Sequence, residues 1–214
     1  MLPNNYAFVT NAPVIPVMVI DHIEQAIPMA QALVAGGLTT LEITLRTACA
    51  VDAIAQIAAH VKGASVGAGT VCTAEQFDAV VAAGAQFVVS PGHSQELFDA
   101  SHKHNTPLLP GAVTATEVMA VLNAGFPVIK FFPASTSGGA AAIKAFGGPF
   151  GDALFVPTGG IGPGNLADYL SLKNIPAVGG SWIIPANAVA CGDWERVTQL
   201  AAQAVELANT IKAS

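Results

Sequence analysis

Val128-Ile129-Lys130-Phe131-Phe132-Pro133 is a short apolar run with a lysine inside it, a pattern typical of a buried β-strand. Only eight of the 214 residues are Lys or Arg, and the other lysines lie in segments with polar or helical patterns. Burying an ammonium group is costly, because a low dielectric disfavours the charged form. A desolvated amine is also a nucleophile towards carbonyl groups. Lys130 is therefore a candidate nucleophile, and the alternative is a lysine whose head group reaches solvent from a strand end.

Outward from this stretch, the chain repeats one unit: a short β-rich run, a turn and an alanine-rich amphipathic run. We predict strands at residues 14–20, 40–45, 65–70, 87–90, 107–112, 128–133, 154–157 and 177–182. We predict helices near residues 23–35, 49–60, 74–83, 95–104, from 114 onward, and near 140–146, 165–172 and 194–212. Gly36-Gly37 suits the end of the first helix. Thr73-Ala74-Glu75-Gln76 has the spacing of a capping box at the start of the third.

Eight strand–helix units predict parallel strands joined by right-handed crossovers. Closed on itself, this arrangement is a (β/α)₈ TIM barrel at the short end of its size range, formed by residues 1–214 as one domain. The alternative is an open, doubly wound sheet. Val66-Gly67-Ala68-Gly69-Thr70 supplies two glycines of a dinucleotide-binding fingerprint, but no third glycine and no acidic residue follow at the required distance. We therefore give that motif no weight.

The second predicted strand places a carboxylate inside such a barrel. Its residues alternate between two faces, with Leu41, Ile43 and Leu45 on one and Glu42, Thr44 and Arg46 on the other. The apolar face must meet the helices, so Glu42 points inward, where carboxylates are rare unless paired or functional. Arg46 lies about 13 Å further along an ideal strand, at the rim. There it can bind a substrate carboxylate through two hydrogen bonds. The alternative is a structural Glu–Lys or Glu–Arg pair.

By the same alternation, Lys130 and Phe132 share a face, so Lys130 and Glu42 can meet inside the barrel. An amine nucleophile beside a general base is what a Schiff-base enzyme needs. Two glycine-rich segments, residues 158–162 and 179–181, follow the seventh and eighth strands. Barrels commonly bind phosphate there through backbone N–H groups. The alternative for both segments is an ordinary glycine turn.

Composition narrows the class of protein. The chain is 52% hydrophobic and 10% charged, with a net charge of −6 and no basic cluster, which argues against nucleic-acid binding. It has no uninterrupted run of 18 apolar residues, so we expect no membrane helix, and residues 1–6 lack the features of a signal peptide. Three cysteines without paired spacing suggest a reducing cytoplasm. Sparse charge suggests a homo-oligomer. His102 and His104 diverge on a helical stretch, so no metal cluster is expected.

Several motifs, in order, resemble one enzyme family. The chain is similar to the bacterial 2-keto-3-deoxy-6-phosphogluconate (KDPG) aldolases, which often also act as 4-hydroxy-2-oxoglutarate (KHG) aldolases, from about Pro13 to about Pro185. The resemblance rests on Pro13-Val14-Ile15-Pro16-Val17, Leu41-Glu42-Ile43-Thr44-Leu45-Arg46-Thr47, Val66-Gly67-Ala68-Gly69-Thr70-Val71, Ser90-Pro91-Gly92, Pro110-Gly111, Lys130-Phe131-Phe132-Pro133-Ala134, Pro157-Thr158-Gly159-Gly160-Ile161 and Gly179-Gly180-Ser181-Trp182.

This resemblance implies a class I aldolase, a carbon–carbon lyase of the Entner–Doudoroff pathway. It is expected to be a cytoplasmic homotrimer that takes a phosphorylated 2-keto acid and pyruvate and uses neither metal nor other cofactor. It implies that Lys130 forms the Schiff base and Glu42 accepts the proton. The implied substrate contacts are Arg46 and Thr70 at the pyruvate carboxylate, Pro91 and Phe132 lining the pocket, Thr158 at the hydroxyl carbon, and Gly159, Gly160, Gly180 and Ser181 at the phosphate.

The chain departs from the family pattern at a few positions. Its segment before Pro13 is short, Gly162 stands where Ser or Asn is common, and His93 stands where an apolar residue is common. His93 can contact substrate, although a loop histidine is more often only solvated. The alternatives to KDPG as the preferred substrate are its galactonate epimer and KHG. Outside enzymes, an inactive barrel serving as a binding or scaffold protein remains the alternative.

Overall fold

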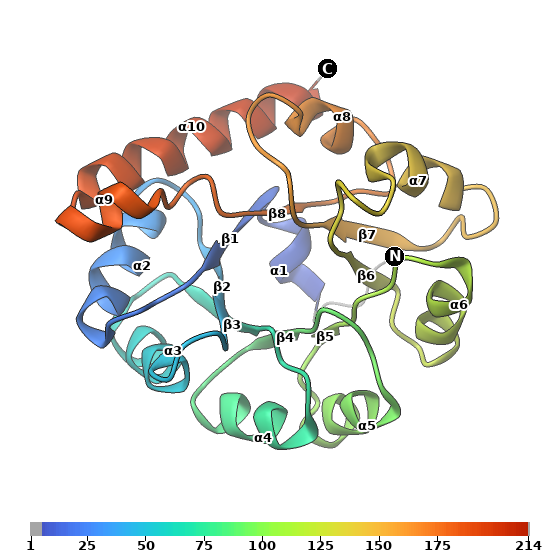
Figure 1. Ribbon diagram of the computed structural model, residues 1–214, viewed down its shortest axis with the longest axis horizontal. Coiled ribbons are helices and arrows are strands. Elements are labelled where there is room, and N and C mark those ends of the chain that lie inside the picture. Colours follow the sequence, from blue (N-terminus) through green and yellow to red (C-terminus); the bar gives the residue numbers. More distant parts are fainter. Residues whose placement is uncertain (1–5, 214) are drawn as a thin grey trace.

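The computed structural model describes residues 6–213, within which eight parallel strands form a ring surrounded by helices (Figure 1). The strands are β1 (Val14–Met18), β2 (Thr40–Thr44), β3 (Ser65–Gly69), β4 (Phe87–Val89), β5 (Leu108–Leu109), β6 (Val128–Phe131), β7 (Leu154–Pro157) and β8 (Val178–Gly180). Each lies within a predicted strand. Residues 1–5, where the sequence predicts no signal peptide, lie outside the described part.

The ring closes through two single bridges. Six strands form one sheet in the order β5-β4-β3-β2-β1-β8, and β6 pairs with β7. Gly111 then bridges to Lys130 between β5 and β6, and Thr158 bridges to Gly179 between β7 and β8, both in parallel. With every neighbouring pair parallel, the predicted (β/α)₈ barrel is confirmed, and the open sheet is wrong.

Helices follow the strands as predicted. They are α2 (Ala26–Ala35, preceded by a 3₁₀ turn at Ile23–Gln25), α3 (Ala50–His60), α4 (Ala74–Ala82), α5 (Gln95–His104), α6 (Ala115–Asn123), α7 (Gly139–Phe146), α8 (Leu166–Leu170) and α10 (Trp194–Ala213). The predicted capping box is confirmed: the Gln76 N–H donates to Thr73 Oγ1 at 3.2 Å, and Gln76 Oε1 accepts from the Thr73 N–H at 3.3 Å. None of the helices in the described part is long and apolar enough to cross a membrane.

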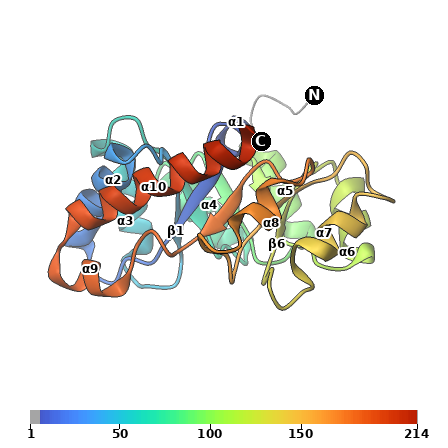
Figure 2. The ribbon, with the colours of Figure 1, turned by 90° about the horizontal axis from the view of Figure 1, so that it is seen from above.

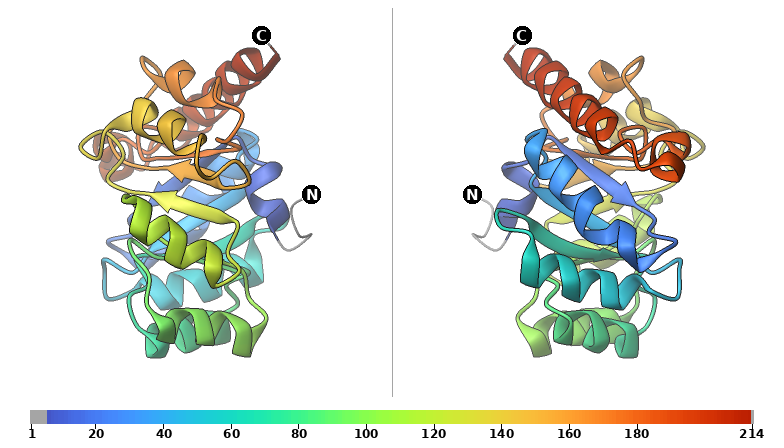
Figure 3. Two further views of the ribbon diagram at one scale, coloured as in Figure 1. Left: turned by 90° about the vertical axis from the view of Figure 1, so that its right-hand side faces the viewer. Right: turned by 90° about the vertical axis from the view of Figure 1, so that its left-hand side faces the viewer.

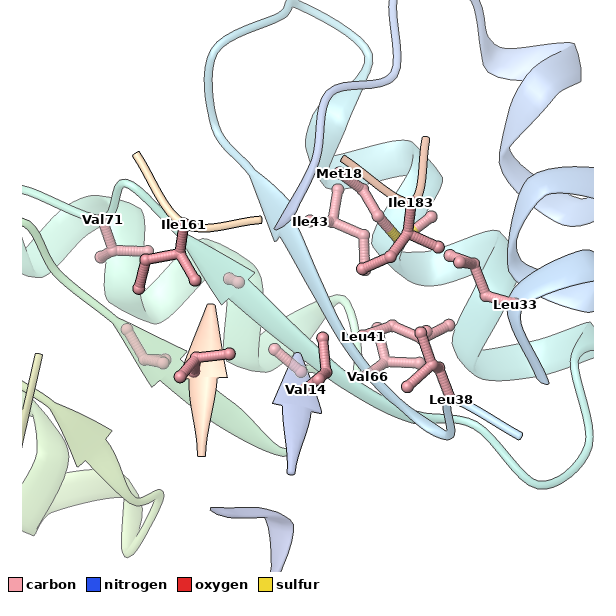
Figure 4. Packing of buried hydrophobic residues seen from close by; sticks show 14 of the residues in the cluster. Val14, Met18, Leu33, Leu38, Leu41, Ile43, Val66, Val71, Ile161 and Ile183 are labelled. Atoms are coloured by element: carbon pink, nitrogen blue, oxygen red, sulfur yellow. The ribbon is translucent and has the colours of Figure 1, made fainter. Parts of the chain in front are cut away.

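Two cores form because strand residues alternate between faces. Outward-facing residues such as Met18, Leu41 and Ile43 pack against the helices, where Leu33 of α2 meets them (Figure 4). A separate cluster fills one end of the barrel interior, with Ile15, Phe87, Val89, Leu109, Val128 and Val156 from the strands. This division confirms that Glu42, on the opposite face from Leu41 and Ile43, points inward.

A short helix, α1 (Ala7–Thr10), closes that end of the barrel, and the sequence analysis missed it. It lies where β1 begins (Figure 2). The ring of Phe8 stacks on Phe87 at 4.2 Å between centroids, and the Tyr6 hydroxyl donates to the Leu108 carbonyl at 3.0 Å. Burial raises the pKa of Tyr6 well above its ordinary value. The barrel is thus sealed at its N-terminal end, so the opposite end is the one available for chemistry.

The last unit contains two helices where one was predicted. The additional helix, α9 (Ala186–Cys191), precedes α10, which runs along α2 and α8 on the outside of the barrel (Figure 3). The Thr198 hydroxyl of α10 donates to the Ala32 carbonyl of α2 at 3.0 Å. This packing holds the C-terminal helix α10 against α2, the helix of the first strand–helix unit.

Candidate active site

An ion pair lies inside the barrel. Lys130 Nζ of β6 donates to Glu42 Oε1 of β2 at 3.1 Å, and the two side chains are 5% and 3% exposed. The alternation along the two strands predicts that Glu42 points inward and that it can meet Lys130, and both are found. The partnership also shows why Lys130 is tolerated in a strand: its charge is opposed by a carboxylate rather than left unpaired.

The residues that surround the Lys130–Glu42 pair leave space for both side chains. A Cβ on Gly69 of β3 would overlap the Glu42 carboxylate, so this position requires glycine if Glu42 keeps its place. Beside the amine, the ring of Phe132 lies 5.3 Å from Lys130 Nζ, a distance at which the ring face attracts a cation. Breaking such a buried pair from one side typically costs about 3–5 kcal/mol of stability, because the remaining charge is left uncompensated.

Arg46 and Thr70 lie just beyond the ends of β2 and β3, towards the open end of the barrel. Arg46 is exposed, as predicted for a residue at the rim, and its guanidinium makes no ion pair within residues 6–213. Thr70 has φ 62°, a left-handed conformation that is costly for a β-branched residue. Strain of this kind, about 1–3 kcal/mol per residue, is concentrated at functional sites.

The loops after β6 and β7, which carry Phe132, Thr158 and Gly159, are held together by backbone hydrogen bonds. The Ala134 N–H donates to the Thr158 carbonyl at 2.8 Å, and the Ser135 N–H donates to the Gly159 carbonyl at 3.2 Å. Thr158 is buried, while Gly159 and Gly160 have φ of 100° and 75°. Glycine alone adopts such angles readily, and they turn backbone N–H groups out of the regular strand pattern.

The remaining predicted residues fall into two separate hollows. Pro91 lines a cavity of about 290 Å³ together with Phe132 and His93. Ser181 is exposed beyond β8 and lines a different cavity of about 450 Å³, beside Val17 and His22. Gly180 is buried at the end of β8. The structure therefore brings Glu42 and Phe132 each beside Lys130, and it distributes the other predicted residues around the open end.

Sequence reasoning overlooked the role of Gly67 and Gly69. In the sequence they stand out only as two glycines of an incomplete dinucleotide fingerprint and as part of a segment that resembles the aldolase family, yet both face the interior, where Gly67 makes room for Phe87 and Gly69 for Glu42. The available signal was their spacing of two residues, which puts both on one face of a strand beside the Glu42 strand.

Candidate metal ligands do not gather within residues 6–213: no group of three or more His, Cys, Asp or Glu side chains is placed to hold an ion. His102 and His104, which the sequence analysis expected to diverge, do so. His102 stacks on Phe126, whereas His104 contacts Asp78.

Fold and site together define the class of protein: a (β/α)₈ barrel enzyme with a lysine–carboxylate pair in its interior. A family model for KDPG and KHG aldolase matches residues 6–200. The KHG/KDPG aldolase of Escherichia coli is 50% identical over 200 residues, which is 94% of either chain. The chain belongs to this family, and it is an aldolase, a lyase that acts on carbon–carbon bonds.

Solved structures agree. A KDPG aldolase from Legionella pneumophila, described with pyruvate captured as a covalent carbinolamine intermediate, superposes with a TM-score of 0.91 at 44% identity, covering 94% of this chain and 98% of that one. The corresponding enzyme of Zymomonas mobilis, described with 3-phosphoglycerate, superposes with a TM-score of 0.88 at 44% identity, covering 94% of each chain.

Proposed function

We propose that this chain is a class I aldolase that cleaves 2-dehydro-3-deoxy-6-phosphogluconate to pyruvate and glyceraldehyde 3-phosphate. We also propose that it cleaves 4-hydroxy-2-oxoglutarate to pyruvate and glyoxylate. The observation that carries the proposal is the 3.1 Å contact between Lys130 Nζ and Glu42 Oε1 inside the barrel. The pyruvate adduct described for the Legionella relative supports the same chemistry.

The mechanism follows from that contact. An ammonium must lose a proton before it attacks a ketone, and the neighbouring Glu42 carboxylate is placed to take it. The Lys130 amine then adds to C2 of the substrate. Glu42 gives its proton to the C2 oxygen, which leaves as water, so a protonated imine forms and the carboxylate is restored. Glu42 accepts the C4 hydroxyl proton, and the C3–C4 bonding electrons move into the imine as the aldehyde departs. Protonation of the enamine at C3 and hydrolysis release pyruvate and restore the free amine.

We propose further roles for the residues around the open end. Arg46 and Thr70 bind the pyruvate carboxylate, Pro91 and Phe132 line the pocket, Thr158 acts at the hydroxyl carbon, and Gly159, Gly160, Gly180 and Ser181 bind the phosphate. The rim position of Arg46 and the strained backbone of Thr70 support the first assignment. The φ angles of Gly159 and Gly160, and the phosphorylated ligand described for the Zymomonas relative, support the last.

Pyruvate and borohydride test the nucleophile. We expect reduction to add one pyruvyl group, seen as a mass increase of the intact chain and mapped to Lys130, because a reduced imine cannot hydrolyse. The adduct should be absent in Lys130→Ala and present in Lys144→Ala, whose lysine is exposed on α7. Label on another lysine, or full aldolase activity of Lys130→Ala, would contradict the assignment. Absence of both the adduct and aldolase activity in the unaltered chain would instead favour the alternative of an inactive scaffold barrel.

A second pair of variants separates the base from the carboxylate-binding group. Glu42→Gln keeps the hydrogen-bonding shape but cannot accept a proton, so kcat should fall by about 10²–10⁴-fold. Arg46→Lys keeps the charge but loses the two-pronged guanidinium, so it should mainly raise KM for pyruvate in the synthetic direction. Steady-state kinetics of both variants measures this. An unchanged kcat with a raised KM in Glu42→Gln would make Glu42 a binding residue.

We also propose a cytoplasmic homotrimer of single-domain chains spanning residues 1–214. The low charge supports assembly: between Glu117 and Lys144, the only charged residue is the buried Lys130. On the outer face of this region, Met119 of α6 is 54% exposed. Sedimentation equilibrium at micromolar concentration should give about three times the chain mass of 21.6 kDa. A monomer at that concentration would rule out the trimer.

A further inference from the structure

A cavity of about 290 Å³ adjoins the reaction centre on the side of β4, β5 and β6. Pro91, Gly92, His93, Gly111, Ala112, Val113, Glu117 and Phe132 line it. Two of these residues join it to Lys130: the Phe132 ring lies 5.3 Å from Lys130 Nζ, and Gly111 bridges to Lys130 in the barrel wall. The cavity therefore lies beside the amine, where a molecule held on Lys130 can extend a group into it.

His93 is fixed in this cavity with a defined tautomer. Its Nδ1 lies 2.9 Å from the Gly111 carbonyl, and its ring stacks on Phe98 at 5.6 Å with planes 12° apart. A carbonyl oxygen only accepts hydrogen bonds, so Nδ1 carries the hydrogen. In the neutral ring, Nε2 is then an acceptor. A partly buried histidine held from two sides is not a freely solvated loop residue.

Glu117 adds a second acceptor to the same cavity. Its Oε2 accepts from the backbone N–H groups of Val113 and Thr114 at 2.8 and 2.9 Å. The hydrogen bond from the Val113 N–H is the largest influence and lowers the pKa of Glu117, while burial, the next largest, opposes it. Hydrogen bonds from Thr114 and the charge of nearby His93 add to the lowering, so the pKa of Glu117 lies below its ordinary value. The carboxylate is therefore ionised near neutral pH. It also adds negative charge at the N-terminal end of α6, which would otherwise attract an anion.

We propose that this cavity receives the hydroxyl of the aldehyde half that does not react, at C5 of the substrate, and that His93 and Glu117 are its hydrogen-bond acceptors. Hydroxyl groups can donate hydrogen bonds, so they suit a lining of acceptors. The carboxylate of glyoxylate can only accept, and in this cavity it would meet the like charge of Glu117. His93 and Glu117 thus favour a hydroxylated, uncharged aldehyde end over glyoxylate. A phosphate at Gly159, Gly160, Gly180 and Ser181 lies on the β7–β8 side and does not compete for this cavity. The inference rests on the proposed aldolase function.

Condensation with pyruvate tests the inference with two unphosphorylated aldehydes, glyceraldehyde and glyoxylate. The readout is the ratio of kcat/KM for glyceraldehyde to that for glyoxylate. Glu117→Gln removes the charge and should raise kcat/KM for glyoxylate, because an amide can donate to a carboxylate. His93→Phe keeps a stacking ring without Nε2 and should lower kcat/KM for glyceraldehyde. Each change should lower the ratio about 2- to 10-fold, the usual worth of one hydrogen bond.

The chain itself supplies the controls. Gln76 occupies the same capping position in α4 that Glu117 occupies in α6, so glutamine suits the structural part of the role. Glu96→Gln removes an exposed charge from the first turn of α5, and His102→Phe replaces a histidine that stacks on Phe126, both outside the cavity. Neither control should move the ratio by more than about 2-fold, as expected for a surface substitution.

The outcomes separate this inference from the proposed function. If the unaltered chain neither forms the pyruvate adduct nor condenses pyruvate with either aldehyde, the proposed function fails. If it does both and the ratio stays within about 2-fold in Glu117→Gln and His93→Phe, the aldehyde subsite is wrong. Loss of the pyruvate adduct in both variants would also overturn the inference, because the cavity would then serve pyruvate rather than the aldehyde.

Discussion

The ion pair between Lys130 and Glu42 is the interaction on which the rest of the site depends. Its partners are 88 residues apart and come from β6 and β2, which are not neighbours in the barrel wall. Only closure of the barrel brings two such strands face to face. An amine and a carboxylate exchange protons readily at 3.1 Å, and their nearly complete burial strengthens every electrostatic effect between them.

Several features of the fold serve this pair. Phe8 of α1 stacks on Phe87 and seals one end of the barrel, so buried apolar side chains fill the interior below the pair and substrate enters from the other side. Gly69 leaves the space that the Glu42 carboxylate fills. The residues proposed to hold substrate lie on the loops at the accessible end, where a scaffold of rigid strands can present them. His93 and Glu117 lie at the same end of the barrel and line the cavity beside Phe132.

Much of the fold and part of the site could be predicted from the sequence, because strand alternation and helix caps depend on residues close together in the chain. Alternation along residues 40–45 placed Glu42 inside, and the capping residues Thr73 and Gln76 marked a helix start that the structure confirms. The short helices α1 and α9 escaped prediction because four and six residues carry too little periodicity, and packing holds them in place. The role of Gly69 could not be predicted, because it depends on the missing side chain at this position. That space becomes apparent only when the position of the Glu42 carboxylate is known. The acceptor-lined cavity joins residues from three separate loops, so no single stretch could reveal it.

The most direct measurement of the central claim is the activity of Gly69→Ala. This change adds one methyl group where the Glu42 carboxylate lies and alters neither titratable group. The account predicts that aldolase activity falls by about 10²-fold or more, the usual worth of a correctly placed general base. Pyruvate should still be trapped on Lys130, and Gly164→Ala, whose added carbon meets nothing within 4 Å, should keep full activity. Full activity in a folded Gly69→Ala would contradict the claim that the carboxylate beside Lys130 carries the proton transfer.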